Sequence, residues 1–300
     1  MQIVRATSFG LLLACGLLAS NTAAAGWDPV PPDPEATAIS TESVPPGAAA
    51  LGYSQCIIDE HPTAADIAPG RTGDYKWFSG EWYQKPVPPM QDYQTEKGVL
   101  AVSLNGNLVS APQDFSASKL PALSGADGFY AEFSVQLSDN DPDHWPAVWL
   151  MPIEHNAAKD DHYAGDPANF ERWAELDVDE GGWGPGLTGT VHAWQGIWPH
   201  YSNIANKNNH SPNALDRTKE HTFGLSYDPH GQRVTWWLDG ESQMWAGSPF
   251  VPEIATRQHF YLLISAQSHK ENKPYVMFVS RVRACIAPTV APPSPHLRVE

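Results

Sequence analysis

The stretch WAELDVDEGGWGPGLTGTVHAW, residues 173–194, places the carboxylates Glu175, Asp177 and Glu180 within six residues and has a tryptophan at each end. Successive side chains of a β-strand point to opposite faces, so Glu175 and Asp177 share one face and the apolar residues beside them share the other. Glu180 is out of phase with both acids. A one-residue bulge near Asp179 would return Glu180 to their face. We therefore predict a bulged strand with three acids in a row.

Short strands separated by turn residues make up the central part of the chain, and no long segment has helical periodicity. The pairs Asn105-Gly106 and Asp239-Gly240 suit the positive φ angles of type I′ turns, so each predicts a β-hairpin. Many short strands at such spacing indicate an all-β sandwich or barrel. The expected strands are 99–104, 107–110, 129–137, 145–151, 221–227, 233–238, 260–265 and 275–284.

The first residues resemble a targeting segment. Residues 1–25 combine Arg5, an apolar run and a small-residue stretch that ends at Ala25, which is typical of a secretory signal peptide. A transmembrane anchor would need about 20 apolar residues, which is more than this run contains. A lipoprotein signal at Cys15 is the other alternative. We expect cleavage after Ala25.

Two proline-rich segments flank the predicted domain. Residues 26–50 contain six prolines among small residues and are expected to form an extended linker, and residues 289–300 a similar tail. Residues 51–288, which lie between them, are enough for one large all-β domain.

The chain is strongly acidic, with 18 Lys plus Arg against 34 Asp plus Glu and a net charge of −16. Removal of residues 1–25 takes away Arg5 and no acidic residue, which makes the mature chain still more negative. Binding to nucleic acid depends on basic side chains that neutralise phosphates, so nucleic acid is not expected as a partner. The same balance disfavours a heavily sulfated polysaccharide unless a local basic cleft overrules it.

Two cysteines remain in the mature chain, Cys56 near the start of the domain and Cys285 near its end. In an oxidising compartment we expect one disulfide between them, joining the terminal strands. Two separate buried thiols are the alternative.

Two carboxyl groups that face one cleft are what hydrolysis of a glycosidic bond requires. One group attacks or stabilises the anomeric carbon, while the other, kept protonated, gives its proton to the leaving oxygen. Between Glu175 and Glu180, Asp177 could hydrogen-bond to Glu175 and raise the pKa of the acid catalyst. The polar stretch 154–172 runs directly into the acidic strand, and we expect it to form one wall of the site.

The motif ELDVDE, residues 175–180, resembles the bulged E-x-D-x-x-E signature of glycoside hydrolase family 16. Members of that family are secreted retaining endo-hydrolases of β-linked polysaccharides with a β-jelly-roll fold. The resemblance implies that residues 51–288 form a jelly-roll sandwich of two antiparallel sheets with a concave substrate cleft. Four further stretches resemble the family in the same order: HWPAVWLMP at 144–152, GTVHAW at 189–194, HTFGLSYDPHGQRVTWWLDG at 221–240 and PYVMFVSRVRA at 274–284.

The resemblance also implies catalytic roles. Glu175 would be the nucleophile, Asp177 its assistant and Glu180 the general acid and base. His192, in the T-x-H segment, would support the catalytic centre by hydrogen bonding. A structural histidine on the concave face is the alternative for His192.

Six of the 12 tryptophans lie between residues 145 and 198, a density that suits a carbohydrate site and also a packed core. By the same resemblance, Trp145 and Trp173 would stack against sugar rings on the glycone side. We assign Trp183 and Trp194 to substrate binding as well, and Trp149 to the core.

The chain departs from the family pattern at two places. Ala174 stands where relatives often carry Gly, and ISAQSHKENK at 264–273 replaces the usual segment before the last strand. Both changes leave the three acids intact and affect the substrate subsites.

A metal centre is not expected at the acids. DVDEGG begins like a calcium-binding loop, but the fifth and twelfth positions of that loop would be Gly181 and Thr188, which do not match the pattern. The predicted hydrolysis requires no cofactor. A structural calcium on the convex face would be typical of the family, and the sequence gives no position for it.

The leading hypothesis is a secreted or periplasmic endo-β-glycanase that acts by double displacement, with β-1,3-glucan of the laminarin type as the favoured substrate. The bulged motif also occurs in relatives that cut agar, porphyran and carrageenan, so a galactan hydrolase is an alternative. A transglycosylase would carry the same acids, whereas a non-catalytic carbohydrate-binding jelly roll would not need to keep them together. We expect a monomer that binds a polysaccharide and has no membrane span.

Overall fold

The computed structural model describes residues 44–113, 118–155, 161–206, 210–211 and 213–288. All of them belong to the unit Pro31–Glu300. The predicted signal peptide 1–25 and the predicted tail 289–300 lie outside the described residues. Among the helices that are described, none has the length and apolar character needed to cross a membrane.

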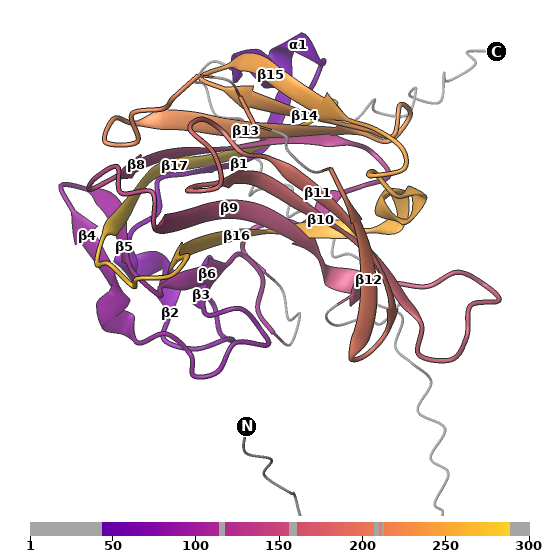
Figure 1. Cartoon of the computed structure of the whole chain (residues 1–300), viewed down its shortest axis with the longest axis horizontal. Coiled ribbons are helices and arrows are strands. Elements are labelled where there is room, and N and C mark those ends of the chain that lie inside the picture. The colour runs from indigo at the N-terminus through magenta and orange to yellow at the C-terminus, as the bar shows by residue number, and fades with distance from the viewer. Residues whose placement is uncertain (1–43, 114–117, 156–160, 207–209, 212, 289–300) are drawn as a thin grey trace, which may run out of the picture. The chain divides into compact units, whose positions relative to one another are not determined.

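Two β-sheets lie face to face in this unit (Figure 1). Within the described residues every strand pair is antiparallel except β2 with β3. The first sheet has the order β15 (Glu241–Ala246), β14 (Arg233–Leu238), β13 (His221–Asp228), β8 (Phe129–Leu137), β17 (Val276–Ile286), β5 (Val99–Ser103) and β4 (Tyr93–Glu96), with β1 (Gln55–Glu60) beside β17. The second has the order β12 (His200–Ala205), β11 (Thr190–Ile197), β10 (Glu171–Glu180), β9 (His144–Pro152), β16 (His259–Ser268), β6 (Asn107–Val109), β3 (Trp77–Ser79) and β2 (Ile67–Ala68), with β7 (Leu123–Ser124) beside β16.

The helices are short. Within the described residues they include α1 (Pro46–Ala50) and the 3₁₀ turns η1 (Ala64–Asp66), η2 (Met90–Asp92) and η4 (Glu253–Arg257). The predicted jelly-roll sandwich of two antiparallel sheets is therefore confirmed.

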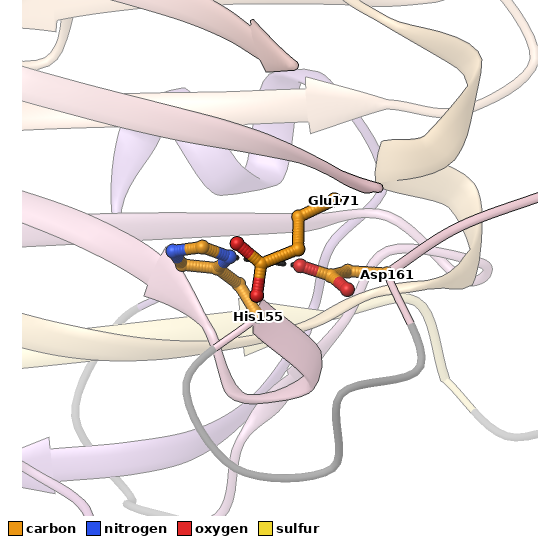
Figure 2. Close-up of side chains that lie close together, drawn as sticks. All are labelled: His155, Asp161 and Glu171. Atoms are coloured by element: carbon orange, nitrogen blue, oxygen red, sulfur yellow. Dashed lines mark hydrogen bonds and ion pairs between the residues drawn. The ribbon is translucent and has the colours of Figure 1, made fainter. Parts of the chain in front are cut away.

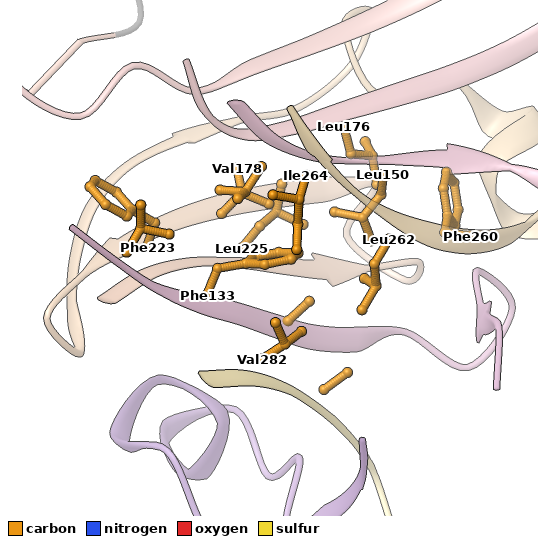
Figure 3. Packing of buried hydrophobic residues seen from close by; sticks show 14 of the residues in the cluster. Phe133, Leu150, Leu176, Val178, Phe223, Leu225, Phe260, Leu262, Ile264 and Val282 are labelled. Carbon is orange, nitrogen blue, oxygen red and sulfur yellow. The ribbon is translucent and has the colours of Figure 1, made fainter. Parts of the chain in front are cut away.

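The core lies between the sheets, where Phe133, Leu225 and Val282 of the first meet Leu176 and Ile264 of the second (Figure 3). Burial of apolar surface is the main term that stabilises such a sandwich. The alternation predicted for residues 129–137 is confirmed, because its five apolar members on one face are all buried: Phe129, Ala131, Phe133, Val135 and Leu137.

The second sheet keeps its other face open for a site. In β9, Val148 and Leu150 are buried in the core, whereas Trp145, Ala147 and Trp149 alternate with them and line a cleft. The continuous buried run predicted for residues 145–151 is wrong at Trp145, Ala147 and Trp149, which are only partly buried. The physical reason is that only one face of this central strand packs against the other sheet.

One of the two predicted hairpins forms and the other does not. Asp239 and Gly240 have φ values of 52° and 82°, and they join the paired strands β14 and β15. At the other site Asn105 has a φ of 73°, but the turn carries the chain from β5 in the first sheet to β6 in the second. The hairpin prediction fails there because β5 pairs with β4 and β17, and β6 with β16 and β3.

The predicted linker is too long at its C-terminal end. Pro46–Ala50 form α1, and Ala48 is fully buried with Tyr130 and Trp237 on the outer face of the first sheet. A Cβ atom added to Gly47 would lie only 2.6 Å from the Tyr130 ring, so the chain packs closely here. Residues 46–50 are therefore part of the fold.

The predicted disulfide is present. Cys56 and Cys285 are directly opposite each other on β1 and β17, and their bond spans a sequence separation of 229 residues. It ties the first described strand to the last.

Candidate active site

The bulge predicted in the acidic strand is present. Val178 is an extra residue of β10 at its pairing with β9. Because of this extra residue, Glu180 lines the same cleft as Glu175 and Asp177. The prediction that the three acids lie on one face of the strand is thus confirmed.

Asp179 is directed away from the cleft. Its Oδ2 accepts a hydrogen bond of 2.6 Å from Arg217 Nη1, and its Oδ1 accepts one of 3.1 Å from the backbone N–H of Thr188. The Asp179 and Arg217 side chains are only 4% and 11% exposed, so each charge needs the other. This ion pair fixes the end of β10 just before Glu180.

Glu175 and Asp177 contact side chains of β11. Trp194 Nε1 donates a hydrogen bond of 2.9 Å to Glu175 Oε2, and His192 Nε2 lies 3.4 Å from Asp177 Oδ2. Oδ2 of Asp177 is buried and accepts no hydrogen bond from any described residue. His192 thus stands beside the acids as predicted, and its neighbour is Asp177.

The tautomer of His192 follows from its second neighbour. The amide nitrogen of Asn203 lies 3.1 Å from His192 Nδ1, so Nδ1 accepts and Nε2 carries the proton that faces Asp177. Burial lowers the pKa of His192, which favours this neutral form.

Glu180 is held from two sides. Trp145 Nε1 of β9 donates a hydrogen bond of 3.2 Å to Oε1, and Thr190 Oγ1 of β11 donates one of 3.0 Å to Oε2. Both oxygens of the carboxyl group therefore have a fixed direction.

The three acids of the motif all have raised pKa values, with burial as the largest cause. The pKa of Glu175 rises to about 7, and the charges of Glu180 and Glu81 contribute to it. The pKa of Asp177 is raised well above its usual range by burial and by the two glutamates of the motif. For Glu180 the neighbouring charge is Asp179, whereas the sequence had suggested Asp177.

The cleft has a volume of about 320 Å³ and includes residues that sequence reasoning missed. Trp149, which was assigned to the core, lies in it and donates a hydrogen bond of 3.0 Å from Nε1 to Ser265 Oγ. That assignment is wrong because Trp149 belongs to the cleft face of β9. The lining residues other than the three acids are Glu81, Tyr83, Trp145, Ala147, Trp149, Ser265 and Gln267.

The predicted wall is also wrong in part. None of the described residues of 154–172 lines the cleft, and Glu81 and Tyr83, which follow β3, do so instead. Trp82 anchors this segment, because its ring stacks on Tyr261 of β16 at 4.3 Å and its Nε1 donates to the carbonyl of Ala111. The other predicted variable stretch, 264–273, contributes Ser265 and Gln267.

Trp173 does not offer a free face to a sugar ring, and its assignment to sugar stacking is wrong for this reason. It is 5% exposed and stacks on His155 with ring centroids 3.6 Å apart. Trp194 stacks beside it at 5.7 Å and Tyr201 meets its edge at 4.8 Å. Trp173 therefore supports Trp194, which holds Glu175.

Trp145 and Trp183 stand at the Glu180 end of the cleft. Trp183 is 56% exposed, and its ring meets that of Trp145 edge to face at 5.8 Å. Trp145 stacks on His269 at 5.1 Å. His269 and Trp183 also line a second hollow of about 400 Å³ together with Lys270 and Lys273. Trp183 is thus open to a ligand beside Glu180.

Among the described residues, two groups of side chains could hold a metal ion by their geometry, since the ligand atoms of each group lie within 4.8 Å of one another. One consists of Glu175, Asp177 and His192. The other consists of His155, Asp161 and Glu171 (Figure 2), where His155 Nδ1 lies 2.8 Å from Asp161 Oδ2.

The His155 group already has partners within the protein. Tyr201 donates a hydrogen bond to Glu171, and His155 is the residue that stacks on Trp173. A metal ion would have to replace the hydrogen bond between His155 and Asp161. The hydrogen bond to Asp161 therefore holds His155 against Trp173, and no ion is needed for this arrangement.

The cleft can carry out acid and nucleophilic chemistry on one bond. Carboxyl groups with raised pKa values share one face, and the bulge sets Glu180 apart from the other two. Such a set can supply a carboxylate on one side of a bond and a proton on the other.

No protein-family profile and no curated protein matches the chain. Solved structures are similar to it at low identity. A β-porphyranase from the human gut bacterium Bacteroides plebeius matches with a TM-score of 0.49 and 13% identity, over 70% of this chain and 84% of that one. The κ-carrageenase from Pseudoalteromonas carrageenovora matches with a TM-score of 0.48 and 15% identity, over 69% and 87%.

A laminarinase catalytic domain from Thermotoga petrophila is similar as well. Its TM-score is 0.45 and its identity 14%, over 77% of this chain and 96% of that one.

Proposed function

We propose that this protein is an endo-acting β-glycanase of the family 16 type, which hydrolyses a β-linked polysaccharide by double displacement. One observation carries the proposal: the bulge at Val178 places Glu180 in the same cleft as Glu175 and Asp177. A strand without the bulge would present Asp179 there, and the structure uses Asp179 for an ion pair with Arg217.

In the proposed reaction Glu175 attacks the anomeric carbon while Glu180 protonates the leaving oxygen. The hydrogen bond from Trp194 orients the Glu175 carboxylate. The raised pKa of Glu180 suits a group that must hold a proton near neutral pH. In the second step Glu180 takes a proton from a water molecule while the water oxygen attacks the anomeric carbon, and the bond between this carbon and Glu175 breaks.

Asp177 and His192 position the nucleophile. Asp177 lies between the two glutamates, and burial together with their charges raises its pKa. His192 Nε2 faces Asp177 Oδ2 at 3.4 Å, and we propose that it donates a hydrogen bond to this oxygen when substrate is bound. Both residues act through Glu175 and do not themselves bond to the substrate.

We favour a neutral β-glucan of the laminarin type as substrate. Of the described residues that line the cleft, four carry carboxyl groups. No described lining residue is Lys, Arg or His. A sulfated chain would find no cation to pair with there. The disulfide between Cys56 and Cys285 suits the oxidising compartment in which we propose that the enzyme works.

The test is a reducing-sugar assay on laminarin, mixed-linkage glucan, agarose, porphyran and carrageenan. Wild type is expected to release reducing ends from a neutral glucan, and Glu175→Gln to release none. Glu96→Gln, a change of an exposed carboxylate on β4, serves as the matched control and should keep full activity. Binding without release by wild type on every polysaccharide would leave a carbohydrate-binding protein in place of an enzyme.

A further inference from the structure

A fourth carboxyl group, Glu81, lies in the cleft and has no part in the proposed reaction. It is 6% exposed and comes from the segment that follows β3, on the side of the cleft formed by β16. Its charge contributes to the raised pKa of Glu175, which places the two carboxyl groups close enough to interact. A buried acid is costly, and an acid beside other acids is more so.

The segment that carries Glu81 is held rigidly. Trp82 stacks on Tyr261, and the guanidinium of Arg71 donates to the backbone carbonyls of Trp82 and Gln84. These contacts hold the segment in place and so position the Glu81 carboxyl group at the cleft. Arg71 also offsets part of the Glu81 charge.

Groups that suit a sugar surround Glu81. Tyr83 donates a hydrogen bond to Glu81. Tyr83 is 61% exposed and lines the cleft, so its ring is open to a ligand there. Ser265 Oγ lies 3.4 Å from Glu81 Oε1 and also accepts the hydrogen bond from Trp149 Nε1. Aromatic faces beside a few fixed polar groups are the usual composition of a ligand pocket.

We propose that Glu81 is a substrate-binding residue that holds a hydroxyl group of a neutral sugar ring next to Glu175 and excludes rings that carry sulfate. This inference rests on the proposed function. Burial raises the pKa of Glu81, and in its carboxylate form the group accepts a hydrogen bond from a hydroxyl group and repels sulfate. The charged and titratable groups around it are Arg71, Tyr83, Tyr93, Glu175 and Tyr261.

Native affinity electrophoresis in gels that contain laminarin or carrageenan tests the proposal, because it measures binding without turnover. The parent is Glu175→Gln, and the double variants add Glu81→Gln, Glu81→Ala or the control Glu96→Gln. Glu81→Gln keeps the shape of the side chain, so it remains informative if Glu81→Ala fails to fold. Thermal melting of each variant checks the fold.

We expect Glu81→Ala to weaken laminarin binding about tenfold, the usual loss for a hydrogen bond to a charged group. Glu81→Gln should weaken it less and should strengthen carrageenan binding, because the repulsion of sulfate is removed. The control should bind both as the parent does. In the active background, Glu81→Gln should move the acidic limb of the kcat/KM profile to lower pH, since the nucleophile loses a negative neighbour.

Unchanged binding of both polysaccharides by the Glu81 variants would overturn the inference, as would a parent that prefers carrageenan or binds neither. A different result would contradict the proposed function alone: wild type binds laminarin in a Glu81-dependent way and yet never cleaves it.

Discussion

Glu180 is the residue on which the proposed reaction depends for its proton. Its two oxygens accept hydrogen bonds from Trp145 and Thr190, so the group has one orientation in the cleft. A protonated carboxyl group is needed when the leaving group is a poor one, such as a sugar hydroxyl. It is not needed when the leaving group is already a stable anion.

Glu180→Ala should therefore lose at least about a hundredfold of turnover on a polysaccharide, within the range typical of general acid catalysis. On an aryl glycoside with an acidic phenol it should keep most of the first step. The measurement is kcat/KM of wild type and variant on both substrates. Equal losses on the two would remove Glu180 from the acid role.

The raised pKa of Glu175 predicts how the stability of the fold changes with pH. Its pKa of about 7 in the folded chain lies above the ordinary value of 4.5, so folding favours its protonated form. The stability that comes with this proton is fully present below about pH 4.5 and is lost as the pH rises through about 7.

Glu175→Gln has no such loss, so its Tm should exceed that of wild type by a few degrees at pH 8 and match it at pH 4. Melting curves between pH 4 and pH 8 measure the difference. Glu96→Gln is the control and should show no difference that grows with pH. A constant gap between Glu175→Gln and wild type would mean that packing, not ionisation, separates them.

The bulged end of β10 is fixed by the opposite sheet. Trp236 of β14 is fully buried and donates a hydrogen bond of 2.7 Å from Nε1 to the carbonyl of Asp177, next to the extra residue Val178. A Cβ atom on Gly189 would lie 2.0 Å from Trp236 Nε1, so β10, β11 and β14 meet here without spare room.

Trp236→Phe should lower kcat by roughly tenfold to a hundredfold with little change in KM, because it loosens the strand that carries the acids. Trp237→Phe is the matched control, since Trp237 donates to Ser226 on the outer face of the first sheet. It should lower Tm by a similar amount and leave kcat unchanged. Parallel losses of kcat in both variants would argue against a special role for the bulge.

The elements also show which local signals can be read from sequence. The alternation in β8 and the Asp239-Gly240 hairpin are local patterns, and the structure keeps both. Asn105-Gly106 has the same local signal, but long-range pairing of β5 and β6 in different sheets overrides it. A two-residue turn favours a backbone geometry and does not choose which strands pair.

At the scale of the molecule, the disulfide joins β1 to β17 across a separation of 229 residues. In the entropy model a loop of this length contributes roughly 4 to 5 kcal/mol. The pair lies with Tyr130 and Trp237 on the outer face of the first sheet, away from the cleft.

Replacement of Cys56 and Cys285 by Ser should lower Tm on the order of 10 °C for a domain of this size. The kcat should stay unchanged because the acids are on the other sheet. Thiol titration of the unfolded, unreduced wild type should find no thiol from this pair. Two free thiols would contradict the bond.

The acids of the site could be predicted because they lie in one strand, where spacing places Glu175 and Asp177 on one face and a one-residue bulge returns Glu180 to it. The segment that carries Glu81 could not be predicted as part of the site. It follows β3, which is distant from β10 in sequence, and only the strand order of the second sheet brings the two strands into one sheet. Trp173 was misassigned for a related reason. Its cover, His155, comes from another segment, and no periodicity reports such a contact.

The central claim is that Glu175 attacks the sugar and Glu180 gives the proton. The most direct measurement is the configuration of the new reducing end, followed by ¹H NMR during the first minutes of laminarin hydrolysis, with Glu175→Gln alongside. If Glu175 and Glu180 act by double displacement, the β-anomer appears first and the variant releases nothing. First appearance of the α-anomer, or release of sugar by Glu175→Gln at the wild-type rate, would contradict it.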